Sequence, residues 1–543
     1  MMEYRILTSL AKVFADECPQ TTWPQRVSML KNEIYSFQVA FLGEEHLTDV
    51  EIRAEGSLAP YMTLREAELV PSLLPAGQFH DDYILRDTPG LYPDPLVPLK
   101  PMVRIIKGLW KSIWVTVKPV DIVGEQTAVV VISHPEKGEL VRAEMEINIL
   151  PAVLPEQELI CTMWFHVDGI ASAHQVDPYS DKGFEIIGNY MKEAAAHGVN
   201  MILTPVLTPP LDTAVGGERM TVQLVDIIRD GDRYEFNFSK LRRYIAVAKE
   251  SGMKYIEIAH FFSQSGAKYA TKVMATDRAD GKYKKIFGWE QNAVSEEYLS
   301  FLRQLVPALV EVIRECGMEK NTYFHVSDEP HVEHMEQYTK AGSALKALIP
   351  GFPVIDALSE IEFYETGAVK KPVPNTTNIQ PFLDAEVPGL WTYYCCGQWE
   401  KVANRFFAMP SERNRVLGIQ LYKFNIAGFL QWGYNFYNVC DSLWSIDPWR
   451  VTDAGGGFPS GDSFVVYPFG DSCVSSLRFE VFQEALQDLR ALKLAEKLCG
   501  REAVLAEMEK GIAPITFFDY PHDPAWLLDL RERINRMIAA EKD

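Results

Sequence analysis

A repeated alternation of apolar and amphipathic segments after Pro155 constrains the fold of this chain more than any other feature. The apolar segments are short and strand-like, and helix-like segments such as 182–198 and 239–252 follow several of them. Strands that alternate with helices form parallel sheets, and a run of such units is typical of a (β/α)8 barrel. The eight expected strands are 159–169, 199–210, 253–262, 321–330, 352–359, 377–382, 389–396 and 429–438.

The first part of the chain has a different pattern, which predicts a β-sandwich. Segments Asn32–Leu42 and Lys111–Ile122 are rich in β-branched and aromatic residues, as strands are. Asp87–Pro101 contains several prolines, so we expect an extended loop rather than a strand there. The predicted fold is therefore α/β, with an N-terminal β-sandwich domain at 1–155 and a (β/α)8 TIM-like barrel with C-terminal helices at 156–543.

The composition indicates a soluble globular protein and argues against two classes of partner. The chain has 543 residues, of which 47% are hydrophobic, and a formal net charge of −21 at pH 7. Because no cluster of Lys or Arg offsets this charge, neither nucleic acid nor an anionic membrane is expected as a partner. We predict a cytoplasmic location, since the N-terminus has no basic segment followed by a long apolar one. None of the eight cysteines forms a CxxC pair, and no sequence feature predicts the oligomeric state.

The expected barrel strands end in polar and aromatic residues. In a (β/α)8 barrel, the residues that bind and convert the substrate follow the carboxyl ends of the strands. Aromatic rings beside amides and carboxylates suit a sugar, which has apolar ring faces and hydroxyl edges. Any one of these aromatic residues could instead fill the core, but their convergence from several strands favours a binding site. The predicted substrate-binding residues are Trp164, His166, His260, Tyr393, Tyr394, Trp432 and Asn435.

Two adjacent acids, Asp328 and Glu329, end the fourth expected strand. They could serve the N-terminus of the helix that follows, where negative charge is stabilising. Pro330, however, disfavours the helical region for the residue before it, so we expect an extended Glu329 at the lip of the barrel. Ordinary retaining glycosidases hold two carboxylates about 5 Å apart on opposite sides of the scissile bond, which adjacent residues fit poorly. Adjacent acids better fit a reaction in which the substrate's own 2-acetamido oxygen attacks the anomeric carbon.

Two histidines that follow the acid pair, His331 and His334, could form a metal site because they lie one helical turn apart. Their spacing is not that of the HExxH motif. The start of the helix would also carry them past the mouth of the barrel. We therefore predict no metal site and no cofactor.

The stretch "SDEP" at 327–330 resembles glycoside hydrolase family 123 and the related domain of unknown function 4091. The stretch "FLQWGYNFYN" at 429–438 looks like the last barrel strand of that family, and "SSLRFEVFQEALQDLRAL" at 475–492 looks like its closing helix. With the strands of the first domain included, the resemblance extends from about Asn32 to Leu492.

This resemblance implies a retaining exo-β-N-acetylgalactosaminidase that works by the substrate-assisted route without a cofactor. At the matching positions, Asp328 would stabilise the oxazolinium-like intermediate, and Glu329 would act as general acid and then general base. The substrate would be a small glycoside or an oligosaccharide. Two alternatives stay open: a glycosidase of another specificity that pairs one of these acids with a distant one such as Asp356, and a carbohydrate-binding protein without catalytic activity.

Overall fold

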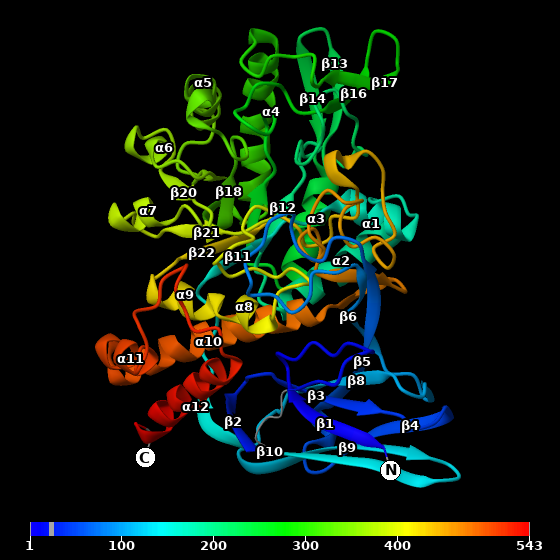
Figure 1. Cartoon of the computed structure of the whole chain (residues 1–543). Coiled ribbons are helices and arrows are strands. Elements are labelled where there is room, and N and C mark those ends of the chain that lie inside the picture. The colour runs from blue at the N-terminus through cyan, green and yellow to red at the C-terminus, as the bar shows by residue number, and fades with distance from the viewer. Residues whose placement is uncertain (1, 21–25, 542–543) are drawn as a thin grey trace.

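The computed structural model describes residues 2–20 and 26–541. Its N-terminal part contains two five-stranded sheets, with strand orders β1-β3-β8-β5-β6 and β2-β10-β9-β4-β7 (Figure 1). Apolar side chains of both sheets, among them Phe37, Val115 and Val130, form one buried cluster, so the sheets pack face to face. The strands are β1 (Glu3–Thr8), β2 (Arg26–Lys31), β3 (Tyr35–Leu42), β4 (Leu47–Glu55), β5 (Met62–Ser72), β6 (Gly90–Pro98), β7 (Val103–Ile105), β8 (Trp110–Val117), β9 (Gly124–His134) and β10 (Gly138–Val153).

The proline-rich segment that we expected to be a loop contains a strand. β6 pairs with β5 in antiparallel register, with Leu91 opposite Pro71 and Tyr92 opposite Val70. β6 is the edge strand of its sheet, and a proline on an edge need not interrupt the ladder because its missing N–H can face away from the partner strand. The expectation of a loop throughout Asp87–Pro101 is therefore wrong.

The second part of the chain contains a six-stranded parallel sheet with the order β18-β15-β12-β11-β22-β21. A separate parallel pair, β19 and β20, is linked to the two ends of this sheet by single parallel bridges, Phe324 to Val354 and Asn375 to Tyr393. The strands are β11 (Ile160–Met163), β12 (Met201–Thr204), β15 (Tyr255–Ile258), β18 (Thr322–Phe324), β19 (Ile355–Ala357), β20 (Lys371–Val373), β21 (Trp391–Tyr393) and β22 (Gly428–Gln431). The mixed α/β class is thus confirmed, with a continuous ladder over six strands.

The sixth expected strand is not where the sequence pattern placed it. Residues 377–382 overlap the short helix α7 (Gln380–Asp384), and the strand β20 lies earlier in the chain. Pro381 is in the first turn of α7, where its missing N–H leaves no helical bond unmade. The other seven expected strands each overlap an observed one.

Helices follow the parallel strands and surround them (Figure 1). These helices are α1 (Val167–His174), α2 (Asp181–Ala196), α3 (Ser239–Glu250), α4 (Glu296–Glu315), α5 (Met335–Lys346), α6 (Glu362–Glu365), α8 (Ser411–Arg415) and α9 (Leu417–Lys423). A four-stranded mixed sheet that the sequence did not predict projects on the side away from the sandwich (Figure 1). Its strands are β13 (Asp226–Asp230), β14 (Arg233–Asn237), β16 (Val273–Asp277) and β17 (Tyr283–Phe287).

The long helix α10 (Leu477–Cys499) lies between the parallel sheet and the sandwich (Figure 1). Arg478 in its first turn forms a buried ion pair with Asp94 of β6, which fastens the two parts together. The division of the chain between residues 155 and 156 stays a prediction. The remaining elements are the strands β23 (Val466–Phe469) and β24 (Ser472–Ser475) and the helices α11 (Arg501–Met508) and α12 (Pro524–Ala540). Among the described residues, no helix combines the length and apolar character needed to cross a membrane.

Candidate active site

A cavity of about 150 Å³ lies at the carboxyl ends of the parallel strands. It is lined by Trp164, Leu211, Asp212, Gln264, Asp328, Glu329, Ala357, Tyr393, Cys395, Cys396, Leu430, Trp432 and Phe458. Most of these residues end or follow β11, β12, β15, β18, β19, β21 and β22, so the strand ends converge on one place. A wider cavity of about 840 Å³ lies between Asp81 and Tyr520, but neither Asp328 nor Glu329 lines it.

Asp328 is the more deeply buried member of the acid pair, with 5% of its surface exposed. Its Oδ2 accepts a hydrogen bond of 2.8 Å from Gln264 Nε2, and its carbonyl oxygen accepts one of 2.8 Å from the Ser265 N–H. Burial, together with the charge of Glu329, raises the pKa of the Asp328 carboxyl well above its usual range. A carboxyl held this way favours its neutral form.

Glu329 is half-buried, and its side chain points toward the end of β21. The Tyr393 hydroxyl donates a hydrogen bond of 2.5 Å to Glu329 Oε1, which fixes the carboxylate in the cavity. The Glu329 N–H donates to the Ala357 carbonyl at 3.0 Å, so the acid pair is also tied to β19. The carboxylates of both acids therefore have fixed positions in one small site.

The backbone of Glu329 is not extended as expected, because its φ angle is +44°. Pro330 disfavours the right-handed helical region, and the chain adopts the left-handed region while bonding to Ala357. Such a conformation costs about 1–3 kcal/mol for a residue other than glycine, and it is typical of functional sites. The alternative of a helix cap finds no support here, since His331 holds the N-cap position of the next helical turn, Val332–His334.

Two tryptophans form walls of the cavity. Trp432 packs edge-on against Phe458 with 5.1 Å between the ring centroids, and its Nε1 donates to Asp462 Oδ2 at 2.8 Å. Trp164 is 2% exposed, and its Nε1 has no hydrogen-bond partner within residues 2–20 and 26–541. Indole rings in these positions offer apolar faces to a sugar ring.

His166 and Asn435 lie outside the cavity lining and brace the strand ends instead. The His166 N–H donates to Asn435 Oδ1 at 2.8 Å, and Asn435 Nδ2 donates to the His166 carbonyl at 3.0 Å. This reciprocal pair joins the segment after β11 to the segment after β22. Tyr394 is buried and donates to Asn414 Oδ1 at 3.3 Å, also away from the cavity. Contact of these three residues with a sugar stays a prediction.

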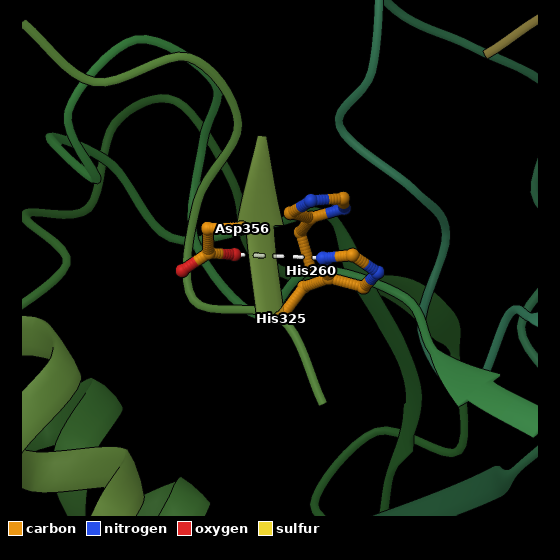
Figure 2. Close-up of side chains that lie close together, drawn as sticks. All are labelled: His260, His325 and Asp356. Carbon is orange, nitrogen blue, oxygen red and sulfur yellow. Dashed lines mark ion pairs between the residues drawn. The ribbon is translucent and has the colours of Figure 1, made fainter. Parts of the chain in front are cut away.

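A buried histidine network packs against Trp164. His325 Nε2 donates to Glu257 Oε2 at 2.8 Å, and His325 Nδ1 lies 3.5 Å from Asp356 Oδ1 (Figure 2). Burial lowers the pKa of His325, but the interactions with the Asp356 and Glu257 carboxylates more than offset this and raise the pKa to about 9. The resulting imidazolium favours the ionised form of Asp328 nearby.

His260 stacks on His325, with 4.3 Å between ring centroids and 28° between ring planes (Figure 2). Ligand atoms of His260, His325 and Asp356 lie within 4.8 Å of one another, which is close enough for a shared ion. Nearly parallel rings, however, direct their in-plane nitrogen lone pairs side by side rather than toward one point. His325 Nε2 is also engaged by Glu257. The group therefore fits a charge network better than a metal site.

Comparison with known proteins assigns the chain to a family. Residues 164–495, which include the acid pair and all of the cavity lining, match the family described as glycoside hydrolase 123, catalytic domain. The chain belongs to glycoside hydrolase family 123. It is therefore a glycoside hydrolase, as its sequence resemblance implied. A search by sequence among curated proteins finds no match.

Solved structures support the fold of this family 123 hydrolase. A family 123 glycoside hydrolase from Clostridium perfringens superposes with a TM-score of 0.75 at 14% sequence identity, covering 100% of this chain and 98% of the other. A family 5 xyloglucanase from Bacteroides ovatus gives a TM-score of 0.32 at 8% identity, covering 85% of this chain and 98% of the other. The first similarity extends over the sandwich and the parallel sheet alike, whereas the second is too weak to support an argument.

Several cavity residues of the family 123 hydrolase were not among the predicted site residues. They are Leu211, Asp212, Gln264, Ala357, Cys395, Cys396, Leu430 and Phe458. Gln264 lies two residues after the third expected strand, so a wider window would have included it, whereas Cys395 and Cys396 lie within the seventh expected strand itself. Phe458 lies far beyond β22, and no sequence pattern indicated that its loop returns to the cavity.

Proposed function

We propose that this family 123 hydrolase releases a terminal β-linked N-acetylgalactosamine with retention of configuration, using the substrate's 2-acetamido group as nucleophile. The observation that carries the proposal is the adjacency of Asp328 and Glu329 on one small cavity. Two carboxylates on consecutive residues are poorly suited to opposite faces of a scissile bond. They are well suited to acting side by side, one on the acetamide and the other on the leaving oxygen.

In the proposed first step, the acetamide oxygen bonds to the anomeric carbon while the bond to the leaving oxygen breaks. Glu329, held by the Tyr393 hydroxyl, gives its proton to that oxygen. Asp328, oriented by Gln264, accepts the amide N–H as the nitrogen gains positive character. The raised pKa of Asp328 indicates that the free pair retains a proton, which the proposal assigns to Glu329 once the amide binds.

In the proposed second step, water attacks the anomeric carbon and the bond to the acetamide oxygen breaks. Glu329, now ionised, takes the proton of the water and returns to its starting form. Two displacements at the same carbon give net retention. Asp328 stays ionised until the ring opens, helped by the His325 imidazolium behind it.

The proposal includes a closed (β/α)8 barrel as its scaffold. The single bridges from β19 and β20 to the two ends of the six-stranded sheet support a ring of parallel strands. A ring would direct every carboxyl end toward the cavity. The similar Clostridium perfringens enzyme is described by its role in glycolipid glycan hydrolysis, and we propose the terminal sugar of a glycan chain as the substrate here.

The alternative that pairs one of these acids with Asp356 is not favoured. Asp356 is fully buried and does not line the cavity. Its Oδ1 accepts from the Val326 N–H at 2.9 Å, and its Oδ2 accepts from the Tyr338 hydroxyl. A carboxylate engaged in this way has no path to a sugar in the cavity.

The test of the proposed mechanism is the response of Asp328→Asn to a thiazoline analogue of N-acetylgalactosamine, which mimics the cyclised intermediate. We expect the analogue to inhibit the wild type strongly and the variant at least about 100-fold more weakly, because the variant lacks the charge that binds the ring nitrogen. The rate of the bond-breaking step on an aryl β-N-acetylgalactosaminide should fall by a comparable factor in the variant. Glu333→Gln, in an acid whose side chain is 78% exposed, is the matched control and should behave as wild type.

A second measurement separates the proposal from a direct enzyme nucleophile. A 2-fluoro sugar lacks the acetamide, so incubation should leave no sugar on the protein by mass spectrometry. An adduct on Asp328, Glu329 or another side chain would refute substrate assistance. Equal turnover of glycosides with and without the acetamide would refute it as well.

A further inference from the structure

Asp212 contributes a third carboxyl group to the cavity, separate from the acid pair. Its Oδ2 is buried and has no hydrogen-bond partner in the described part of the chain. Trp164 Nε1, a buried donor on the same cavity, is unpaired in the same sense. A buried polar atom without a partner is costly, and native structures rarely retain one without a reason. An unpaired acceptor and an unpaired donor on one cavity together indicate a missing polar ligand.

The backbone of Asp212 is fixed on both sides of the side chain. Its N–H donates to Gln264 Oε1 at 2.8 Å, and its carbonyl oxygen accepts from Ser442 Oγ at 2.6 Å. Its φ angle is +41°, a left-handed conformation that is costly for most residues other than glycine. These bonds hold the backbone in place, so the carboxyl group has a defined direction.

The same glutamine connects Asp212 to the acid pair. Gln264 uses its Oε1 for the Asp212 N–H and its Nε2 for Asp328 Oδ2, with both distances 2.8 Å. The side chain of Gln264 therefore bridges the loop after β12 and the end of β18. A ligand bound to Asp212 would be placed at a fixed distance from Asp328.

The chemistry of Asp212 suits the hydroxyl groups of a sugar. A carboxylate only accepts hydrogen bonds, and its two oxygens can receive two neighbouring hydroxyls. Burial raises the pKa of the Asp212 carboxyl to about 6, against the opposite effect of Arg219. The group is therefore largely ionised at neutral pH, and hydroxyl donors would relieve its desolvation.

We propose that Asp212 is a specificity-determining residue of this site, whose carboxylate receives ring hydroxyls of the sugar held between Trp164 and Trp432. This inference rests on the proposed function for the identity of the sugar, and it adds which residue distinguishes that sugar from its relatives. Asp212 selects among sugars by their hydroxyls, whereas Asp328 and Glu329 act on the acetamide and the leaving oxygen.

The test is a double-change cycle, in which residue 212 and the hydroxyl groups of the substrate are changed separately and together. The substrates are 4-nitrophenyl β-N-acetylgalactosaminide and its 3-, 4- and 6-deoxy analogues, and the proteins are wild type, Asp212→Asn and Asp212→Ala. We expect the wild type to lose at least about 100-fold in kcat/KM on one or two of the deoxy substrates, because the carboxylate is then left unpaired. On the parent substrate, kcat/KM of Asp212→Ala should be lower than that of the wild type by a similar factor. Removal of the same hydroxyls from the substrate should then lower kcat/KM of this variant by less than about threefold.

Asp212→Asn guards against a variant that fails to fold, because asparagine adopts the left-handed region more readily than alanine does. Its kcat/KM on the parent substrate should be about 10- to 100-fold lower than that of the wild type, since a neutral acceptor bonds a hydroxyl less strongly than a charged one. Glu333→Gln is again the control, because Glu333 is exposed and does not line the cavity. It should retain the full hydroxyl preference of the wild type.

Calorimetric binding of N-acetylgalactosamine and its deoxy analogues repeats the cycle without turnover. The inference is overturned if Asp212→Ala and wild type discriminate equally at all three hydroxyls. The role of Asp212 can also be tested if the proposed mechanism is wrong. Should the enzyme cleave glycosides that lack the acetamide, the proposed function fails, and the same cycle on those glycosides still decides the role of Asp212.

Discussion

At the scale of single residues, the site combines two costs that a protein core normally avoids. Asp328 is a buried carboxyl beside a second carboxyl, and Glu329 has a left-handed backbone. Burying a charge without a full counter-charge is unfavourable, and His325 offsets only part of this cost at Asp328. Strain and unfavourable charge at one place are typical of a site selected for reactivity rather than stability.

Replacement of the buried charge should therefore stabilise the protein. The folded-state pKa of Asp328 is raised, so the stability that its neutral form contributes is complete below the usual carboxyl pKa and is lost as the pH rises through the raised value. We expect Asp328→Asn to increase the free energy of unfolding by about 1–3 kcal/mol at pH 7 and by much less near pH 4. Urea denaturation between pH 4 and pH 8 measures this difference, and a variant less stable than wild type at pH 7 would contradict it.

The residues that the sequence could predict are those whose position follows from strand periodicity alone. Trp164, Tyr393 and Trp432 end or follow strands directly, and all three line the cavity. His166 has the same kind of position, but its side chain bonds to the Trp432 carbonyl and to Arg219 instead. The direction of its side chain depends on the neighbouring strand, which a single sequence does not specify. Asp212 lies deep in a loop, whose path is set by contacts with distant residues rather than by local pattern.

At the scale of elements, β22 and the loop that contains Phe458 together build one wall of the cavity. Trp432, just after β22, is held by Asp462 through its indole N–H and by Phe458 through its ring. The wall is thus rigid before any ligand arrives. Rigid aromatic surfaces bind sugars at a low entropic cost, because little side-chain freedom is lost.

Removal of the Trp432 ring should weaken sugar binding without unfolding the protein. We expect Trp432→Ala to reduce the binding free energy of N-acetylgalactosamine by about 1–3 kcal/mol, through loss of apolar and stacking contact. Trp432→Phe retains a ring but loses the bond to Asp462, so its affinity should lie between those of Trp432→Ala and wild type. Titration calorimetry gives the affinities, and circular dichroism checks the fold. Unchanged affinity, or a variant that simply misfolds, would assign Trp432 to the core.

The errors in the predicted elements have two physical causes. β20 has only three residues, Lys371–Val373, and one of them is Pro372, so no run of β-branched or aromatic residues marks the strand. β6 contains prolines that are disfavoured in a central strand and tolerated on an edge, and edge position is a property of the whole sheet. In both places, local sequence carried less information than the pairing of distant segments.

At the scale of the whole molecule, buried charges join the sandwich to α10. Arg478 donates through Nε and one terminal nitrogen to the two oxygens of Asp94, each at 2.8 Å, and the Tyr467 hydroxyl also donates to Asp94. Arg65 of β5 donates to Glu480 Oε1 at 2.6 Å, two residues further along the same helix. Both pairs are largely excluded from water. The sandwich therefore supports the helix that closes the catalytic part of the chain.

Variants that break the first of these pairs should reveal that the two parts are thermodynamically coupled. Removal of one partner leaves an uncompensated buried charge, so Arg478→Met and Asp94→Leu should each destabilise the protein by about 3–5 kcal/mol. The double variant should lose clearly less than the sum of the two, because it buries no lone charge. Urea denaturation should show one transition, coincident for tryptophan fluorescence and far-ultraviolet circular dichroism, since each part depends on the other across this interface. Additive losses would show that the pair is not coupled, and two separate transitions would show that the sandwich folds independently of α10.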